Sequence, residues 1–206
     1  MTRIGVFGGT FDPPHLGHLI VAECAADVLN LSVVLFTPAA DPPHKADRQI
    51  TPAQHRKCMV ELAIQGNDHF KLSEVDLNRP GPQYTVDTLR LIAGQYPLAE
   101  LYFIMGGDSL SNFLSWHDPA GIIAQAQLAL IQRPGSRINI AALDTRLPGL
   151  MARCVNVDAP EVGLAATDLR DDLRMGRSVR YRLTDSVIAY IDHNQLYRDS
   201  ANFPLS

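Results

Sequence analysis

Two adjacent glycines, Gly8 and Gly9, and two histidines, His15 and His18, lie close together near the start of the chain, in the segment GVFGGTFDPPHLGHL at residues 5–19. Glycine allows a backbone to approach a ligand closely, because it has no Cβ atom. A helix that begins near Gly17 would direct unpaired N–H groups and the positive end of its dipole toward that ligand. His15 and His18, three positions apart on one face of the helix start, would add imidazole N–H donors. These residue types together predict a phosphate-binding site.

Other interpretations of this segment stay open at this point. It matches neither G-x-G-x-x-G nor G-x-x-x-x-G-K-[ST], since no lysine follows the glycines. The histidines could be ordinary loop residues, with Gly8 and Gly9 serving only a tight turn. The pair H-x-x-H could also bind a metal ion, but no third ligand follows nearby at a useful spacing. We therefore expect no metal held by protein side chains.

The rest of the sequence alternates apolar runs with helical segments. Residues 3–7 and 32–36 predict buried strands on either side of a helix over residues 18–30. A strand, a helix and a strand in this order imply parallel strands joined by a right-handed crossover. Further strands are expected at residues 69–75, 100–106, 126–132 and 153–157. Further helices are expected between residues 51 and 66 and at residues 85–95, 118–125, 167–175 and 184–193.

These elements predict one doubly wound, Rossmann-like α/β domain over residues 1–206, with a mostly parallel sheet, a helical C-terminal end and a frayed tail from about residue 198. In such sheets, ligands bind beyond the carboxyl ends of the strands, where the first loop meets a helix N-terminus. GGTFDPPHLGH occupies that position. One helix boundary has a capping box, with Thr51 as N-cap, Pro52 at the first helical position and Gln54 completing the box.

Composition limits the classes of protein to which the chain can belong. The formal net charge is −4 and hydrophobic residues make up 46% of the chain, which is ordinary for a soluble globular protein. An acidic balance argues against a nucleic-acid coat or a membrane-surface protein. No apolar stretch approaches the roughly 20 residues of a membrane span, and the N-terminal strand is too short for a signal-peptide core. The three cysteines lack C-x-x-C spacing, which favours reduced, mostly buried thiols in the cytoplasm.

The glycine-histidine segment resembles the signature of the nucleotidylyltransferase superfamily, whose (H/T)-x-G-H motif is His15-Leu16-Gly17-His18 here. Class I aminoacyl-tRNA synthetases share a related H-x-G-H motif, but this chain is too short for one and has no K-M-S-K-S element. Seven further segments follow the order seen in bacterial nicotinate-nucleotide adenylyltransferases. They are PPHK (42–45), YTVDTL (84–89), MGGDSL (105–110), W (116), QRPG (132–135), ATDLR (166–170) and YI (190–191). The resemblance therefore spans nearly the whole chain.

The resemblance implies adenylyl transfer from ATP to nicotinate mononucleotide, with direct in-line attack on the α-phosphorus of ATP. His15 and His18 would be catalytic, as donors to the phosphates. The implied ATP-binding residues are Gly8, Gly9, Thr10, Phe11, His15, His18, Lys45, Thr167 and Arg170. Mg²⁺ would travel with ATP and be held by phosphate oxygens and water, without a dedicated protein ligand. ATP and the mononucleotide would be the partners, with no nucleic acid or membrane and with a homo-oligomer possible.

The implied mononucleotide-binding residues are Thr85, Asp108, Trp116 and Arg133. In the family, an aromatic ring at the position of Trp116 stacks on the nicotinate ring, whereas tryptophan more often packs in a core. Asp108 would accept from ribose hydroxyls, or would cap a helix over residues 109–114. Arg133 would meet a phosphate or a ribose, or would be an ordinary loop residue.

The match departs from the family pattern at one position. Where the pattern reads I-S-S/A-T-x-I-R, Ala165 replaces the first serine, while Thr167 and Arg170 match. We expect Thr167 at a helix N-cap and Arg170 in the first turn. Rival functions are other adenylyl- or cytidylyltransferases of the superfamily, or a non-catalytic nucleotide-binding relative. Retention of both histidines, Lys45 and Arg170 favours the enzyme.

Overall fold

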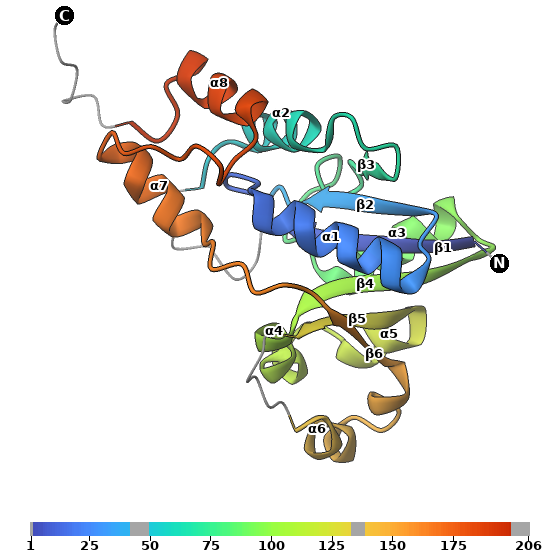
Figure 1. Cartoon of the computed structure of the whole chain (residues 1–206). Helices are drawn as coiled ribbons and strands as arrows, with labels where there is room; N and C mark the ends of the chain where they lie inside the picture. The colour runs from blue at the N-terminus through green and yellow to red at the C-terminus, as the bar shows by residue number, and fades with distance from the viewer. Residues whose placement is uncertain (1, 42–49, 133–138, 199–206) are drawn as a thin grey trace, which may run out of the picture.

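The computed structural model describes residues 2–41, 50–132 and 139–198. Its centre is a six-stranded sheet with the order β3-β2-β1-β4-β5-β6 (Figure 1). All neighbouring strands pair in parallel, which confirms the predicted doubly wound α/β fold. The strands are β1 (Thr2–Gly9), β2 (Val33–Pro38), β3 (Phe70–Leu72), β4 (Ala99–Gly106), β5 (Ala126–Gln132) and β6 (Cys154–Asp158). The direction of the strand order reverses between β1 and β4, where such folds bind ligands.

Helices cover both faces of the sheet, because alternate strand residues point to opposite faces. On one face, Val34 and Phe36 of β2 pack against α1 (Leu16–Leu29) and α2 (Ala53–Ile64). On the other face, Ile4 and Val6 of β1 pack against α3 (Thr85–Gln95) and α5 (Pro119–Gln125). Figure 1 shows α1 crossing in front of the sheet. The continuous apolar runs of the sequence are therefore explained by burial on both faces.

A smaller core joins the C-terminal helices to the rest of the domain. It contains Met59 of α2, Leu169 of α7 (Ala166–Arg174) and Val187 and Ile191 of α8 (Asp185–His193). Figure 1 shows α2 and α8 side by side at one end of the molecule. The predicted helical C-terminal end is thus confirmed. Its packing brings the last described elements to the loop that follows β1.

Short helical segments complete the described fold. They are α4 (Gly107–Ser111), α6 (Ile140–Arg146) and two 3₁₀ turns at Phe113–Ser115 and Met151–Arg153. The sequence pattern does not predict α6. None of its side chains is fully buried, although Ile140 and Leu143 pack against the core. The Asn139 side chain caps it by accepting from the Ala142 N–H at 3.0 Å.

Three predicted helix starts are wrong. Helix α2 has Pro52 as its N-cap, without a side-chain cap, and the Gln54 amide faces Cys58 instead of completing a capping box. The Thr51 carbonyl accepts a hydrogen bond from the buried side chain of Arg56. Helix α7 has Ala165 as its N-cap, so Thr167 is the second helical residue and Arg170 lies in the second turn.

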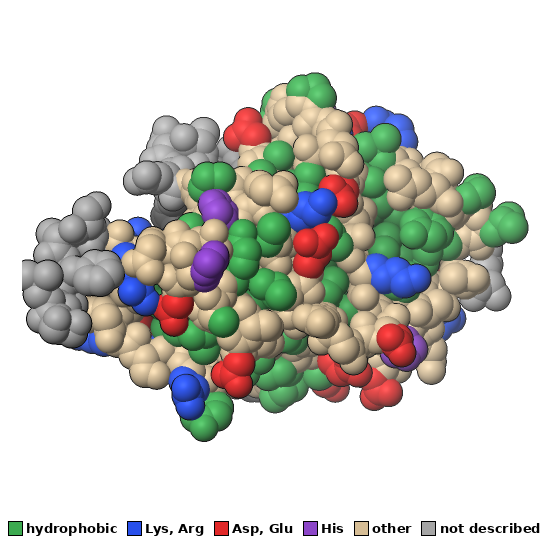
Figure 2. Space-filling view, turned by 90° about the horizontal axis from the view of Figure 1, so that it is seen from above, with side chains coloured by type: hydrophobic (Ala, Val, Ile, Leu, Met, Phe, Trp, Pro, Cys, Tyr) green, Lys and Arg blue, Asp and Glu red, His purple; other side chains and the backbone are tan. Residues whose placement is uncertain are grey.

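Helix α4 also begins earlier than expected, because Gly106 is its N-cap. Asp108 therefore lies within the helix and does not cap it. The three cysteines carry free thiols, as predicted, but each is half-buried, not deeply buried. None of the helices in the described parts of the chain is long and apolar enough to cross a membrane. Figure 2 shows basic and acidic side chains interspersed over one face of the molecule.

Candidate active site

The loop that follows β1 crosses the carboxyl end of the sheet and is fixed by aromatic packing. Phe11 is buried and has a φ of 50°, in the left-handed region. Its ring lies edge-on to that of His18, with ring centroids 5.1 Å apart, and it also packs against Phe7. A Cβ atom at Gly9 would lie 2.9 Å from the Phe11 ring. Gly9 is therefore required because the loop folds back onto the end of its own strand.

His15 is the N-cap of α1, and its backbone N–H donates to Nδ1 of His18 at 3.1 Å. Because Nδ1 of His18 accepts this bond, the proton of a neutral ring lies on Nε2. The two imidazoles stack, with centroids 3.7 Å apart. A Cβ atom at Gly17 would lie 3.0 Å from Nδ1 of His15, so the glycine makes room for that ring. The spacing H-x-G-H thus sets the tautomer of one ring and the position of the other.

His15 is buried, with 8% of the residue exposed. Burial lowers its pKa from 6.5 to about 4, because the charged form loses its hydration. His15 is therefore neutral near pH 7. It offers one N–H donor in an uncharged ring at the start of a helix, where the dipole already favours an anion.

Two cavities lie at the carboxyl ends of the central strands. The larger, of about 240 Å³, is lined by His15, Gly17 and His18 of the first loop and helix and by residues of the connection that leads from β6 to α7. The smaller, of about 160 Å³, is lined by Gly8, Gly9 and other residues of the opposite side of the sheet. Phe7 lines the larger cavity, whereas Gly8 and Gly9, the last two residues of β1, line the smaller one. The end of β1 therefore separates two spaces in which two different molecules can lie.

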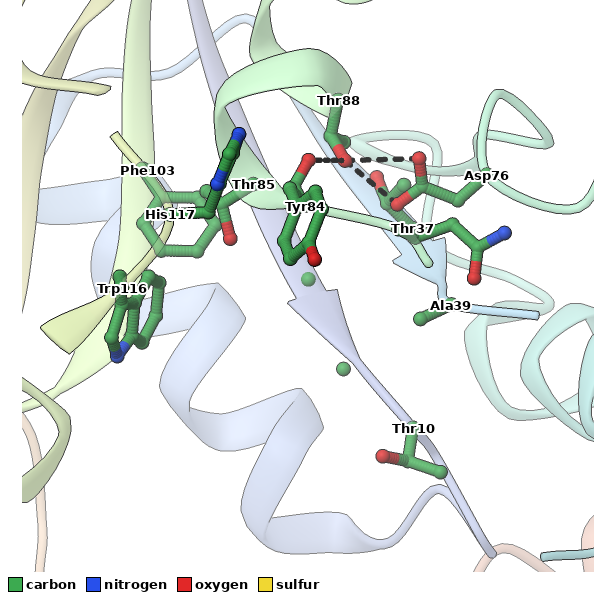
Figure 3. A pocket seen from close by; sticks show the side chains of 13 residues that line it. Thr10, Thr37, Ala39, Asp76, Tyr84, Thr85, Thr88, Phe103, Trp116 and His117 are labelled. Atoms are coloured by element: carbon green, nitrogen blue, oxygen red, sulfur yellow. Dashed lines mark hydrogen bonds between the residues drawn. The ribbon is translucent and has the colours of Figure 1, made fainter. Parts of the chain in front are cut away.

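Aromatic residues border the smaller cavity (Figure 3). The half-buried Trp116 ring packs against Phe113, with centroids 5.5 Å apart, and edge-on to Phe103, at 6.0 Å. Trp116 also lines the cavity, so it belongs to the core and to the site at once. Tyr84 stacks on His117, with centroids 4.1 Å apart and planes at 25°. These rings provide a flat, apolar wall suited to a heteroaromatic ring.

The opposite wall of this cavity is polar and buried. The Thr88 hydroxyl lies 2.8 and 2.9 Å from the two carboxylate oxygens of Asp76, and Arg79 lies 2.9 Å from the same carboxylate. Burial raises the pKa of Asp76, against the opposing effect of these partners. Arg79 also donates to the Tyr84 carbonyl at 3.3 Å. This network fixes the start of α3, which carries Tyr84 and Thr85 at the cavity.

The first loop is also held from the C-terminal part of the chain. Arg170 of α7 donates to the Asp12 carbonyl at 2.7 Å. The Tyr197 hydroxyl donates to Oδ1 of Asp12 at 2.6 Å, and the Thr51 N–H donates to Oδ2 at 3.3 Å. Thr167 is exposed beside Arg170, with 3.5 Å between its hydroxyl and the guanidinium. Asp12 therefore links the loop that follows β1 to three distant segments, which contain Thr51, Arg170 and Tyr197.

The residues predicted from the sequence lie in several different parts of the structure. His15 and His18 line the larger cavity, whereas Gly8, Gly9 and Thr10, expected beside ATP, line the smaller one with Thr85 and Trp116. Phe11 is buried beneath His18, and Thr167 and Arg170 lie on α7. Asp108 lies in α4, directly after β4. Lys45 and Arg133 lie outside the described residues, as does the predicted tail from about residue 198, apart from Arg198 itself.

Sequence reasoning missed several residues that the structure brings to the site. Tyr84, Asp76 and Thr88 line the smaller cavity. Tyr84 and Thr88 lie in the segment YTVDTL, from which only Thr85 is predicted as a site residue, and Asp76 lies in a segment without a distinctive pattern. Arg56 is buried directly behind the first loop. A signal for Arg56 did exist, because it shares the buried stripe of α2 with Met59, at spacing i and i+3. No cluster of three or more His, Cys, Asp or Glu side chains suited to a metal ion occurs in the described residues.

Comparison with known proteins gives consistent matches over nearly the full length. The cytidylyltransferase-like family model matches residues 6–172. A probable nicotinate-nucleotide adenylyltransferase of Thermomicrobium roseum is 48% identical, over 96% of this chain and 92% of the relative. One of Thermus thermophilus is 43% identical, over 95% of this chain and 100% of the relative. The solved structure of Plasmodium falciparum nicotinic acid mononucleotide adenylyltransferase complexed with NaAD has the same fold, with a TM-score of 0.77, 19% identity and coverage of 96% and 98%.

Proposed function

This chain belongs to the cytidylyltransferase-like family and, within it, to the nicotinate-nucleotide adenylyltransferases, and from this premise we propose that it transfers the adenylyl group of ATP to nicotinate mononucleotide. The products are deamido-NAD and pyrophosphate, in a step of NAD biosynthesis. The observation that carries the proposal is the pair of cavities on either side of the end of β1. One is lined by two imidazoles and the other by an indole.

The reaction needs no nucleophile from the protein, because the phosphate of the mononucleotide is itself an anion. One of its oxygens attacks the α-phosphorus of ATP, and the bond from that phosphorus to the pyrophosphate oxygen breaks in line. The protein must bring two anions together and stabilise the charge that grows on the leaving group. Positioning alone accounts for roughly 7–11 kcal/mol of the barrier in favourable cases. The two adjacent cavities supply this positioning.

His15 and His18 are the proposed donors to the phosphates of ATP. Nε2 of His18 carries the ring proton, because Nδ1 accepts from the backbone of His15. A fixed donor of this kind costs no reorganisation as charge develops, and its loss typically lowers the rate by about 10²–10³. The N-terminus of α1 adds its N–H groups and dipole beside the two rings.

The smaller cavity is the proposed mononucleotide site. The nicotinate ring would stack on Trp116, whose indole borders the cavity in Figure 3. The hydroxyl of Thr85, the first residue of α3, is offered to the ligand from the adjoining wall. Asp108 would accept from the ribose hydroxyls of the mononucleotide, and Arg133 would meet its phosphate or its ribose. Backbone N–H groups of Gly9 and Thr10 would meet the phosphate between the two cavities.

The remaining proposed contacts to ATP come from Lys45, Thr167 and Arg170. Arg170 is already anchored to the Asp12 carbonyl through Nη1, which orients its guanidinium toward the first loop. Mg²⁺ would be held by phosphate oxygens and water and would neutralise part of the triphosphate charge. We further propose that the enzyme is a single domain that acts in the cytoplasm and binds neither nucleic acid nor membrane.

The test is a pyrophosphate-release assay with ATP and one acceptor at a time. We expect rapid release with nicotinate mononucleotide, slower release with nicotinamide mononucleotide and none with phosphopantetheine. No release with either pyridine nucleotide would refute the proposal, and release with phosphopantetheine alone would assign the chain to another transferase activity. The fluorescence of Trp116, the single tryptophan, measures binding independently. Binding without release would identify a non-catalytic relative.

A further inference from the structure

Arg56 of α2 is 1% exposed and is among the largest side chains that the described residues bury completely. Arginine is almost never fully buried unless its charge and its N–H groups are compensated. Here the compensation comes from backbone oxygens. Nε donates to the Thr51 carbonyl at 2.8 Å, and Nη1 donates to the carbonyls of Thr10, at 2.8 Å, and Ala39, at 2.7 Å. Nη2 donates to the Ala40 carbonyl at 3.0 Å.

The carbonyls that Arg56 binds include those of two segments that leave the sheet. Thr10 follows the last residue of β1, and Ala39 and Ala40 follow the last residue of β2. The two strands are paired up to Gly9 and Pro38, and one further bond runs from the Ala39 N–H to the Gly9 carbonyl at 3.0 Å. Beyond this point, the Arg56 guanidinium, and not a pair of backbone groups, connects the two segments by hydrogen bonds. It bridges two chain segments that have left the sheet, and it supplies donors to their carbonyls.

Both bridged segments border the smaller cavity, which Thr10 and Ala39 line together with Gly8 and Gly9. The planar guanidinium directs its N–H groups along fixed directions in one plane, so it sets the separation of the two segments. A lysine ammonium would place its donors on one atom and could not reach the same carbonyls with the same geometry. Burial lowers the pKa of Arg56, and the nearby Asp12 carboxylate opposes this effect by compensating part of the buried charge.

We propose that Arg56 is a positioning residue for the mononucleotide, because its guanidinium fixes the distance between the Thr10 and Ala39 walls of the smaller cavity. It touches no reacting atom and acts through these two backbone segments. The inference rests on the proposed function, since it assigns the smaller cavity to the mononucleotide. It adds a residue that binds neither substrate but determines the affinity for one of them.

The experiment compares Arg56→Ala and Arg56→Lys with the unaltered protein and with Arg90→Ala. Arg90 is an exposed arginine of α3 that pairs with Asp87, so its removal controls for loss of a charge. Steady-state rates give separate KM values for ATP and for nicotinate mononucleotide. Circular dichroism and thermal melting establish that each variant is folded. If Arg56→Ala does not yield folded protein, Arg56→Lys serves as the test, because it keeps the charge and most of the volume.

We expect both Arg56 variants to raise the KM for the mononucleotide about tenfold or more, because misplaced walls weaken its binding. The KM for ATP should change much less, since the larger cavity lies on the other side of β1. Guanidinium ion, well below denaturing concentrations, should lower the raised KM of Arg56→Ala, whereas methylammonium should not. Arg90→Ala should match the unaltered protein.

Three results would overturn the inference. One is a loss of rate in proportion to the folded fraction, with both KM values unchanged. Another is an equal rise in both KM values, which would indicate general loosening of the fold. The last is an Arg56→Lys variant with an unaltered KM, which would show that charge alone suffices. Failure of the proposed function is recognised separately, because the unaltered protein would then form no product with the mononucleotide.

Discussion

Acid should destabilise this protein through His15, and the size of the effect follows from the burial of that side chain. The unfolded chain binds a proton at His15 near pH 6.5, whereas burial lowers the pKa in the folded chain to about 4. Between these values the unfolded state holds more protons than the folded state. The free energy of unfolding therefore falls as the pH falls through this window, and the contribution of neutral His15 is fully present above pH 6.5.

The magnitude can be worked out from the two pKa values. One pKa unit corresponds to about 1.4 kcal/mol, so complete protonation of both states costs the fold about 3 kcal/mol. Between pH 7 and pH 5 the loss is about 2 kcal/mol, because the unfolded chain is then almost fully protonated at His15 and the folded chain is not. His15→Gln removes the titrating group, so its free energy of unfolding should fall by about 2 kcal/mol less between pH 7 and pH 5 than that of the unaltered protein.

Urea unfolding at pH 7, 6 and 5, followed by circular dichroism, measures this difference. The comparison uses the change of the free energy of unfolding with pH in each protein, so any effect of the substitution at pH 7 cancels. His69→Gln, which removes an exposed imidazole, is the control and should keep the pH dependence of the unaltered protein. An equal loss of stability in His15→Gln and the unaltered protein would refute the reasoning.

Three other substitutions test the site. His18→Ala should slow pyrophosphate release about 10²-fold or more without unfolding the protein, and unchanged turnover would remove His18 from the catalytic role. Gly17→Ala would place a Cβ atom 3.0 Å from Nδ1 of His15, so turnover should fall about tenfold or more. Its melting temperature should not fall, because alanine favours a helix, and a variant of full activity would contradict the tight fit. Thr88→Val leaves the buried Asp76 without its hydroxyl donor and should cost about 1–3 kcal/mol in urea unfolding; unaltered stability would show that the bond contributes nothing.

The order and type of most elements can be predicted from the sequence, for a physical reason. Strands buried on both faces are continuous apolar runs, so β1, β2, β4 and β5 stand out. Helix α3 is located correctly because Thr85 and Gln95 bound a regular apolar stripe. Helix α6 escapes prediction because it has only seven residues and none of its side chains is fully buried. Helix starts are less well predicted, because local capping patterns do not show tertiary contacts such as the bond from Arg56 to the Thr51 carbonyl.

The site itself can be predicted only in part. The relative positions of His15 and His18 can be predicted from their spacing, because both residues lie within the first turn of one helix. The smaller cavity is different, since its walls come from the ends of β1, β2 and β4 and from the start of α3. Which single residues of those segments face the cavity depends on strand register and helix orientation. Asp76 and Tyr84 therefore require the structure, and the division of the glycines from the histidines between two cavities does as well.

The bonds to Asp12 have a consequence for the synthesis of this protein. They span 158 residues to Arg170 and 185 residues to Tyr197. The Leu16 N–H, at the start of α1, likewise donates to the Arg182 carbonyl at 2.9 Å. On the ribosome, the loop that follows β1 is synthesised early, whereas Arg170 of α7 and Tyr197, which bind Asp12, are synthesised late. A nascent chain therefore makes all of these contacts to the loop only after Tyr197 has left the exit tunnel.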